Sequence, residues 1–463
     1  MTQKYNDLDC LKKEWLKIKP KIESLFVEQW NDPELPGMET KSYARLANWM
    51  EDNDFQVTHS PYNIPTAFIA SSETKIKSPT ICILAEYDAL PGLNIKNQTK
   101  KYYKNAGHGC GHNHIGPANV GAAIAAAKAI KILKVPGNIK VIGCPAEEIL
   151  WGKIALFNNG AFSDIDCILT SHGDYQNGSI SRPCQSVVSG ELIFEGESGH
   201  GGSLYENNAL NAAEKTIFKV ETELKKQFPN ILFRHVIRQA GLIPTITPEE
   251  SRIWYSTRGF DFIETQQAYQ NIVNTGKQIS SDLKIKFHNQ FISETKGYFP
   301  NATIGKELFK SLKLVGPPKW TPDDLEFMDK LVKKVSNGKK MTLHKDIGYF
   351  DQNEDYFGQD DGEVSWRIPL GRVNWAYPME IPIHNRAWTE LSGNKASYPG
   401  PLMASEALAL TSINLLKNPE ILKEAKEELK KKTQNIKITK PRLGAFKTMT
   451  QNPKSFWDGT WRE

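Results

Sequence analysis

The spacing of apolar residues divides the first part of the chain into alternating helices and strands. Apolar residues recur at helical spacing over 8–30, which predicts an N-terminal helix. The near-continuous apolar run TICILAEYDA at 80–89 indicates a strand buried on both faces of a sheet. An Ala-rich helix is expected at 117–133, followed by strands at 139–145 and 167–173. This alternation is typical of a mostly parallel α/β sheet.

The pattern changes in the middle of the chain, where strand-like alternation and helical periodicity follow each other in the order β-α-β-α-β. The strands are expected at 190–196, 253–260 and 282–288, and the helices at 209–227 and 265–279. Such an order over about a hundred residues resembles a small ferredoxin-like insert. Beyond Tyr298 the chain returns to α/β character and closes with an Ala/Leu-rich helix at 402–416 and a basic helix.

We therefore expect an α/β fold with one mostly parallel-sheet domain made of two chain segments and one inserted α+β domain. The first domain comprises 1–187 and 299–463, and the insert comprises 188–298.

Composition and charge exclude several classes of protein. Hydrophobic residues make up 39% of the 463 residues, which is enough for a core and too much for disorder. The net charge of +5 is a weak bias on so long a chain, and the Lys-rich stretch at 424–432 is interpreted as a solvated helix face, so no nucleic-acid partner is expected. The opening MTQKYNDLDC lacks the apolar segment of a signal peptide, and no apolar run spans a bilayer. We expect a cytoplasmic protein with no membrane partner.

Side chains that bind metals are concentrated in four places. GHGCGHNHI (107–115) carries Cys110 and His112, and GCPAEE (143–148) ends with Glu147 and Glu148. TSHGD (170–174) carries His172, and PIHNRAW (382–388) carries His384. The first three places lie at the carboxyl ends of predicted strands or open the next helix, where ligand sites form in open α/β sheets. A mixture of thiolate, imidazole and carboxylate suits Zn, Mn or Co better than Mg or Ca.

Each of these segments also has an ordinary structural explanation. A lone His at a strand end, such as His172, is usually a satisfied structural residue, and a Glu pair at a helix start usually serves the helix dipole. The pair Cys110 and His112 is compatible with a thiol nucleophile and its base as well as with a shared metal ion. The six Cys residues show no CxxC spacing, so neither a disulfide framework nor a zinc ribbon is indicated.

Taken together and in order, the motifs resemble those of the aminoacylase/carboxypeptidase superfamily of metallopeptidases. Within it, the chain is most similar to the amidohydrolase branch of N-acyl-amino-acid and auxin-conjugate hydrolases. Besides the four segments above, the resemblance rests on AEYDALPG (85–92), ESGHGGS (197–203) and GQDDGEVSW (358–366), and it extends from PELPGMET (33–40) to the helix at 402–416.

The resemblance implies a role for each matching residue. Two divalent ions, Mn²⁺ or Zn²⁺, would be held by a candidate ligand set of five residues: Cys110, His112, Glu148, His172 and His384. Glu147 matches the general base, and Asp88 matches a carboxylate that orients one of the ligands. His200 of the insert matches a residue that contacts the scissile carbonyl or the substrate carboxylate, and Arg258 matches one that holds the substrate carboxylate.

The sequence departs from the family pattern at several positions. Glu86 stands where related peptidases carry a metal-binding His, which fits the presence of Cys110. Thr245 replaces an Asn of the insert, and Tyr398 replaces a His near the C-terminal helix. These two changes put substrate contacts of the family in doubt. His114, beside the ligand pair, is interpreted as structural.

The function implied by the resemblance is a metal-dependent amidohydrolase that cleaves the amide bond of an N-acyl amino acid, through a metal-bound water and Glu147. An aromatic acyl compound such as p-aminobenzoyl-glutamate is the expected small-molecule substrate. The insert would serve as lid and dimerisation domain, in a homodimer or in a heterodimer with a related subunit. A dipeptidase, another N-acyl-amino-acid hydrolase, a non-catalytic metal-binding partner subunit and a thiol hydrolase built on Cys110 remain as alternatives.

Overall fold

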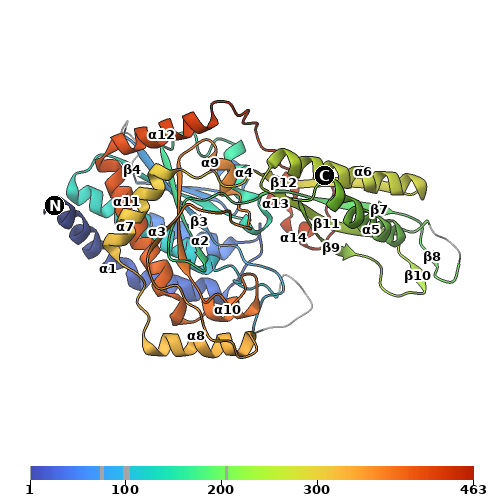
Figure 1. Ribbon diagram of the computed structural model, residues 1–463, viewed down its shortest axis with the longest axis horizontal. Helices are drawn as coiled ribbons and strands as arrows, with labels where there is room; N and C mark the ends of the chain where they lie inside the picture. The colour runs from blue at the N-terminus through green and yellow to red at the C-terminus, as the bar shows by residue number, and fades with distance from the viewer. Residues whose placement is uncertain (1, 73–77, 97–104, 204–206) are drawn as a thin grey trace. The chain divides into compact units, whose positions relative to one another are not determined.

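A computed structural model describes residues 2–72, 78–96, 105–203 and 207–463. Its contacts divide the chain into two units, each with its own hydrophobic core (Figure 1). The first unit consists of residues up to 182, 299–353 and 364–438, and the second consists of 183–298, 354–363 and 439–463. The apolar pattern of the sequence did not indicate that 354–363 and 439–463 contact the insert.

The first unit is built on an eight-stranded sheet with the order β1-β2-β4-β3-β5-β14-β6-β13. The strands in this order are Gln56–His59, Phe68–Ser71, Asn138–Cys144, Thr80–Glu86, Cys167–Asp174, Leu370–Ala376, Gly178–Ile180 and Gly348–Phe350. The four central strands β4, β3, β5 and β14 run parallel to one another. Every residue of β3 is buried, which explains its continuous apolar run. The predicted parallel α/β sheet is confirmed.

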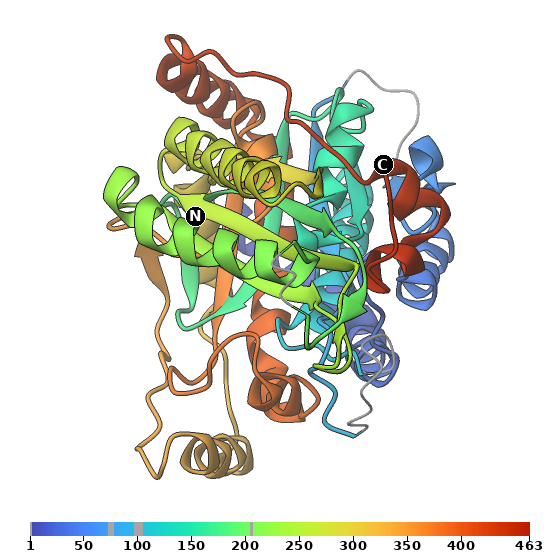
Figure 2. The same ribbon diagram turned by 90° about the vertical axis from the view of Figure 1, so that its right-hand side faces the viewer.

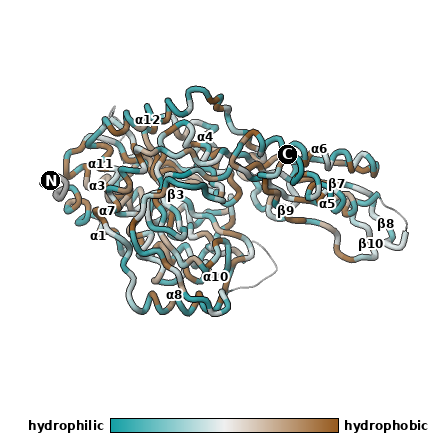
Figure 3. Tube along the Cα trace, in the orientation of Figure 1, coloured by the Kyte–Doolittle hydropathy of each residue, from teal (hydrophilic) through white to brown (hydrophobic). Residues whose placement is uncertain are grey.

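Helices of the first unit cover this sheet. The helices α3 (His112–Leu133), α7 (Ala302–Val315) and α11 (Pro399–Lys417) contact its strands, and α1 (Thr2–Asn31) packs on α3 and α11. In Figure 3 brown apolar segments gather where α3, α11 and β3 meet. The remaining helices of at least seven residues in this unit are α2 (Thr40–Glu51), α4 (Gly152–Asn158), α8 (Pro322–Val335), α10 (Arg386–Ser392) and α12 (Pro419–Thr433).

The second unit contains a four-stranded antiparallel sheet with the order β12-β7-β11-β9. Its strands are β7 (Ser186–Glu195), β9 (Leu232–Gln239), β11 (Glu250–Gly259) and β12 (Lys286–Thr295). The helices α5 (Ala209–Gln227) and α6 (Phe262–Asp282) lie side by side over one face of this sheet (Figure 2). The chain order of strands and helices and the order of strands in the sheet are those of a ferredoxin-like fold, which is the class predicted for the insert, although the predicted order lacked β9.

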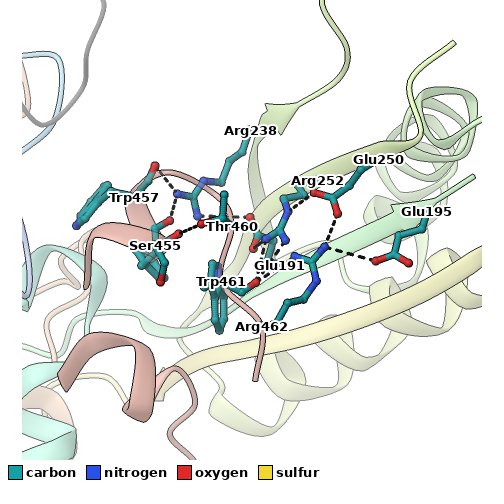
Figure 4. Close-up of polar contacts among 11 residues, drawn as sticks. Glu191, Glu195, Arg238, Glu250, Arg252, Ser455, Trp457, Thr460, Trp461 and Arg462 are labelled. Atoms are coloured by element: carbon teal, nitrogen blue, oxygen red, sulfur yellow. Dashed lines mark hydrogen bonds and ion pairs between the residues drawn. The ribbon is translucent and has the colours of Figure 1, made fainter. Parts of the chain in front are cut away.

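The opposite face of this second sheet is covered by residues 439–463, here called the C-terminal segment. Because side chains alternate along a strand, Ile253 and Tyr255 join the core under the helices while Arg252 and Trp254 point the other way. Arg252 binds Glu191 Oε2 at 2.9 Å and the carbonyl oxygen of Trp461 at 3.3 and 3.4 Å (Figure 4). The segment contains α13 (Phe446–Gln451) and α14 (Pro453–Trp457).

Two local expectations are corrected by the structure. The strand expected at 282–288 is wrong in its first half, because α6 continues to Asp282 and β12 begins at Lys286. Strand β9 was not expected, because it is an edge strand whose exposed residues are both apolar and polar, so its sequence lacks a clear alternation of the two kinds. Among the described residues, no helix is long and apolar enough to cross a membrane.

Candidate metal centre

Three side chains from one loop–helix junction and the end of a strand meet at the carboxyl edge of the main sheet. Cys110 precedes α3, His112 is the first residue of α3, and His172 lies on β5. Their ligand atoms lie within 4.8 Å of one another, and Cys110 Sγ is 3.5 Å from His172 Nε2. The structure thus brings together three of the five candidate ligands in an arrangement that can hold one ion.

A second group shares the same thiol. Cys110, Glu148 and His384 also have ligand atoms within 4.8 Å of one another, and His384 Nε2 is 3.4 Å from Glu148 Oε2. The backbone N–H of His384 donates to the carbonyl oxygen of Gly109 at 2.9 Å, which ties this distant loop to the loop of Cys110. Since Cys110 belongs to both groups, the geometry is compatible with a thiolate shared by two ions.

The loop of Cys110 depends on a glycine. Gly111 has φ +85°, a conformation in the left-handed region that glycine adopts without strain. The turn at Gly111 lets α3 begin at His112 and places Cys110 just outside the helix N-terminus. The positive end of a helix dipole favours a thiolate over a thiol at this position.

Asp88 links two candidate ligands. Its Oδ1 lies 2.9 Å from His112 Nδ1, and its Oδ2 accepts the backbone N–H of Glu148 at 2.9 Å. The bond to Nδ1 turns the other ring nitrogen of His112 toward Glu147 Oε2 at 3.7 Å and Glu148 Oε1 at 3.8 Å. A carboxylate that fixes the tautomer and direction of a histidine is common beside metal ligands.

Several buried polar atoms at this edge have no hydrogen-bond partner in the described structure. They are Glu86 Oε2, His112 Nε2 and Glu148 Oε1. Buried polar atoms are normally satisfied, so a convergent group of such acceptors requires an explanation. The donor set of thiol, imidazole and carboxylate fits a divalent transition metal, and a bound cation gives such buried acceptors a partner. The site therefore fits the metal that the motifs imply.

Within the chain alone, the surroundings of Glu148 and Cys110 disfavour the charged forms of both side chains. Burial, together with Asp88 and Glu86, raises the pKa of Glu148 to about 8, although His112 opposes this rise. Burial also raises the pKa of the Cys110 thiol, and the neighbouring Glu148 adds to the effect. A bound cation reverses both tendencies, because it favours the carboxylate and the thiolate.

A buried ion pair lies beside the cluster and was missed by the sequence analysis. Lys153 Nζ is 2.8 Å from Glu86 Oε1, and both side chains are at most 1% exposed. Burial alone would raise the pKa of Glu86, but Lys153, with His112 and His172, lowers it to about 2. The signal in the sequence was a lone Lys in the otherwise apolar start of a helix, GKIALFN (152–158), which needs a charged partner when buried.

The remaining predicted residues belong to the second unit. His200 lies on the short strand β8 (Gly199–His200), is exposed, and accepts the Gly202 N–H on Nδ1 at 3.0 Å. Its strand pairs with β10 (Ile246–Thr247), a short strand that directly follows Thr245. Arg258 is on β11, half-buried, in register with Val187 of β7. The cluster of the first unit is thus formed without either residue.

Two other residues singled out in the sequence lie in the packed core of the first unit. His114 is buried, with Tyr377 Oη 2.9 Å from its Nδ1 and its ring edge-on to Phe26. Burial lowers its pKa to about 3, so the ring is neutral. Tyr398 packs edge-on against the same Phe26. These contacts agree with a structural role for His114.

The chain is similar in sequence to known hydrolases. The chain is 26% identical over 444 residues to one of the subunits of p-aminobenzoyl-glutamate hydrolase from Escherichia coli, a match that covers 86% of this chain and 90% of the relative. It is 25% identical to a mouse Xaa-Arg dipeptidase, over 88% of this chain and 89% of the relative. These relatives identify the chain as a hydrolase of the amidohydrolase and peptidase class.

Comparison of the fold with solved structures also finds a peptidase. A solved structure from Bacillus subtilis, described as a dinuclear metal-binding peptidase from the M20 family, superimposes with a TM-score of 0.52 at 16% identity, over 86% of this chain and 98% of that one. None of the models of known protein families matches the chain. The resemblance drawn from the motifs is confirmed, and the hydrolase has the α/β fold of this structural neighbour. The clustered donors of the chain itself fit a metal centre.

Proposed function

We propose that this hydrolase cleaves the amide bond of an N-acyl amino acid, with p-aminobenzoyl-glutamate or a similar aromatic acyl-glutamate as substrate. The observation that carries the proposal is that the candidate ligands form two groups that share Cys110, with Glu147 in contact range of His112. The similarity to a component of p-aminobenzoyl-glutamate hydrolase supports the choice of acyl group.

The candidate ligand set would hold Mn²⁺ or Zn²⁺. When bound, such ions polarise the amide carbonyl and lower the pKa of a water molecule. Glu147 has a buried side chain next to Glu148, and its Oε2 is 3.7 Å from His112 Nε2. In this position its carboxylate can take the proton of the attacking water and deliver it to the leaving nitrogen.

The second unit supplies the groups that recognise the substrate in this proposal. His200, exposed on β8, would donate a hydrogen bond to the oxyanion that develops on the carbonyl. Arg258 would pair with the free carboxylate of the amino-acid half, since a guanidinium and a carboxylate form two parallel hydrogen bonds. The insert acts in this way as a lid in a homodimer, or in a heterodimer with a related subunit.

The proposal is tested by a substrate screen with protein reconstituted with Mn²⁺ or Zn²⁺. Release of p-aminobenzoate from p-aminobenzoyl-glutamate, faster than cleavage of dipeptides, is the expected result. The similarity to an Xaa-Arg dipeptidase favours dipeptides as a second substrate class, so dipeptides with C-terminal Arg belong in the same screen. A chain that binds metal but cleaves neither class would contradict the proposal.

A further inference from the structure

The segment PELPGMET (33–40) belongs to the motif series but contributes no residue to the candidate metal centre. Within it, Glu39 is completely buried although its side chain is charged in water. Burying a carboxyl group is costly unless its oxygens are satisfied. The partners of the two carboxyl oxygens therefore indicate the role of Glu39.

Glu39 is the N-cap residue of α2, yet its side chain makes no capping bond. Glu34 caps the helix instead, because its carboxylate accepts the N–H groups of Lys41 at 3.0 Å and Ser42 at 2.8 Å. An N-cap side chain normally accepts such bonds itself. Because Glu34 caps the helix, the carboxyl group of Glu39 can form a contact elsewhere.

That contact is the backbone N–H of Ala146, which donates to Glu39 Oε1 at 2.8 Å. The same oxygen accepts the N–H of Gly37, and Oε2 accepts the hydroxyl of Thr66, both at 2.8 Å. Ala146 directly precedes Glu147 and Glu148. Glu39 thus reaches across 107 residues of sequence to the turn that carries the proposed base and one candidate ligand.

The turn requires such support because its backbone is strained. Ala146 has φ +55° and ψ +39°, in the left-handed region that residues other than glycine, asparagine and aspartate seldom occupy. The turn is held from both sides, since Asp88 accepts the N–H of Glu148 at 2.9 Å while Glu39 accepts that of Ala146. Glu147 lies between the two anchored amides.

We propose that Glu39 is a positioning residue, which holds the Ala146 turn so that Glu147 and Glu148 point into the metal centre. Its role in turnover rests on the function proposed above, whereas its role in the backbone does not. Oε1 accepts the amide of the turn, and Oε2 accepts the hydroxyl of Thr66. This separation allows the two halves of the carboxylate to be tested independently.

The test compares four variants. Glu39→Ala removes the acceptor of the Ala146 amide, and Glu39→Gln keeps an oxygen there while its amide donates to the Thr66 hydroxyl. Thr66→Val is the matched control, since it removes the contact of Oε2 and leaves Oε1 in place. The double variant Glu39→Ala/Ala146→Gly replaces the strained alanine by a residue that adopts positive φ freely.

Hydrogen exchange of the peptide 144–151, measured by mass spectrometry on the metal-free chain, gives a readout independent of activity. We expect faster exchange of this peptide in Glu39→Ala and wild-type exchange in Glu39→Gln and Thr66→Val. In the metal-reconstituted enzyme, kcat of Glu39→Ala should fall by about 10²-fold at unchanged KM, the effect of misplacing a catalytic group by about 1 Å. The double variant should recover part of this loss.

Three results would overturn the proposal. The first is wild-type exchange and kcat in Glu39→Ala. The second is the same loss in Thr66→Val as in Glu39→Ala, and the third is a loss in Glu39→Gln as large as in Glu39→Ala. If wild-type protein cleaves no substrate but the exchange follows the expected order, the proposed function fails while the positioning role stands. If Glu39→Ala does not fold, Glu39→Gln, Thr66→Val and the double variant still decide the question.

Discussion

The buried pair of Lys153 and Glu86 allows a quantitative prediction about the first unit. Lys153→Met keeps the apolar stem of the side chain and removes the ammonium group, which lies 2.8 Å from Glu86 Oε1. Because neither side chain is more than 1% exposed, water cannot replace the lost partner. Removing one partner of such a pair strands a buried charge, so we expect a loss of about 3–5 kcal/mol in the free energy of unfolding.

The assay is urea unfolding of the metal-free protein, followed by fluorescence and circular dichroism, with metal removed because bound ions stabilise the native state by mass action. Lys140→Met is the matched control: its partner Asp164 is 62% exposed, so its loss should cost only about 0–1 kcal/mol. Adding Glu86→Gln to Lys153→Met should recover most of the lost stability, since no charge remains unpaired. Equal stability of the two Lys variants would refute the reasoning.

The remaining predictions concern the proposed chemistry. Reconstituted protein should hold up to two divalent ions per chain by elemental analysis, and activity with less than half an equivalent of metal would rule out the candidate ligand set. Glu147→Gln should keep its metal and lose turnover by about 10²–10⁴-fold, whereas Glu148→Gln should lose metal; equal metal content in the two variants would contradict their separate roles. His200→Ala should lower kcat by about 10²–10³-fold with metal content unchanged. Mixing His200→Ala with Glu147→Gln chains should restore activity if the histidine acts across a homodimer, and should not if it acts within its own chain.

Much of the fold could be predicted from the sequence where burial leaves a periodic pattern. Helix α5 has the bounds expected from its apolar spacing, because one face packs on a sheet and the other meets solvent. Strand β3 was recognised because both of its faces are buried. Strand β9 was not, since an edge strand that exposes both apolar and polar residues lacks that pattern.

Some residues of the candidate metal centre could likewise be predicted from the sequence, and others could not. Cys110, Glu148 and His172 could be grouped in advance because parallel strands deliver their carboxyl ends to one edge of a sheet. Glu39 and Lys153 could not be assigned their contacts, because their partners lie 107 and 67 residues away and no periodicity links them. Only the packing of α2 and α4 in the folded chain brings these charges to the turn of Ala146 and to Glu86.

The docking of the C-terminal segment onto the second sheet has a consequence for the order in which the protein is made. The strands that carry Glu191 and Arg252 leave the ribosome long before Trp461, whose carbonyl oxygen Arg252 binds. Domains generally fold as units during synthesis, but this unit cannot close until residues 439–463 have emerged. A nascent chain stalled before Thr439 presents Arg252, Glu191 and Trp254 on an open sheet face, where a chaperone or a protease can reach them.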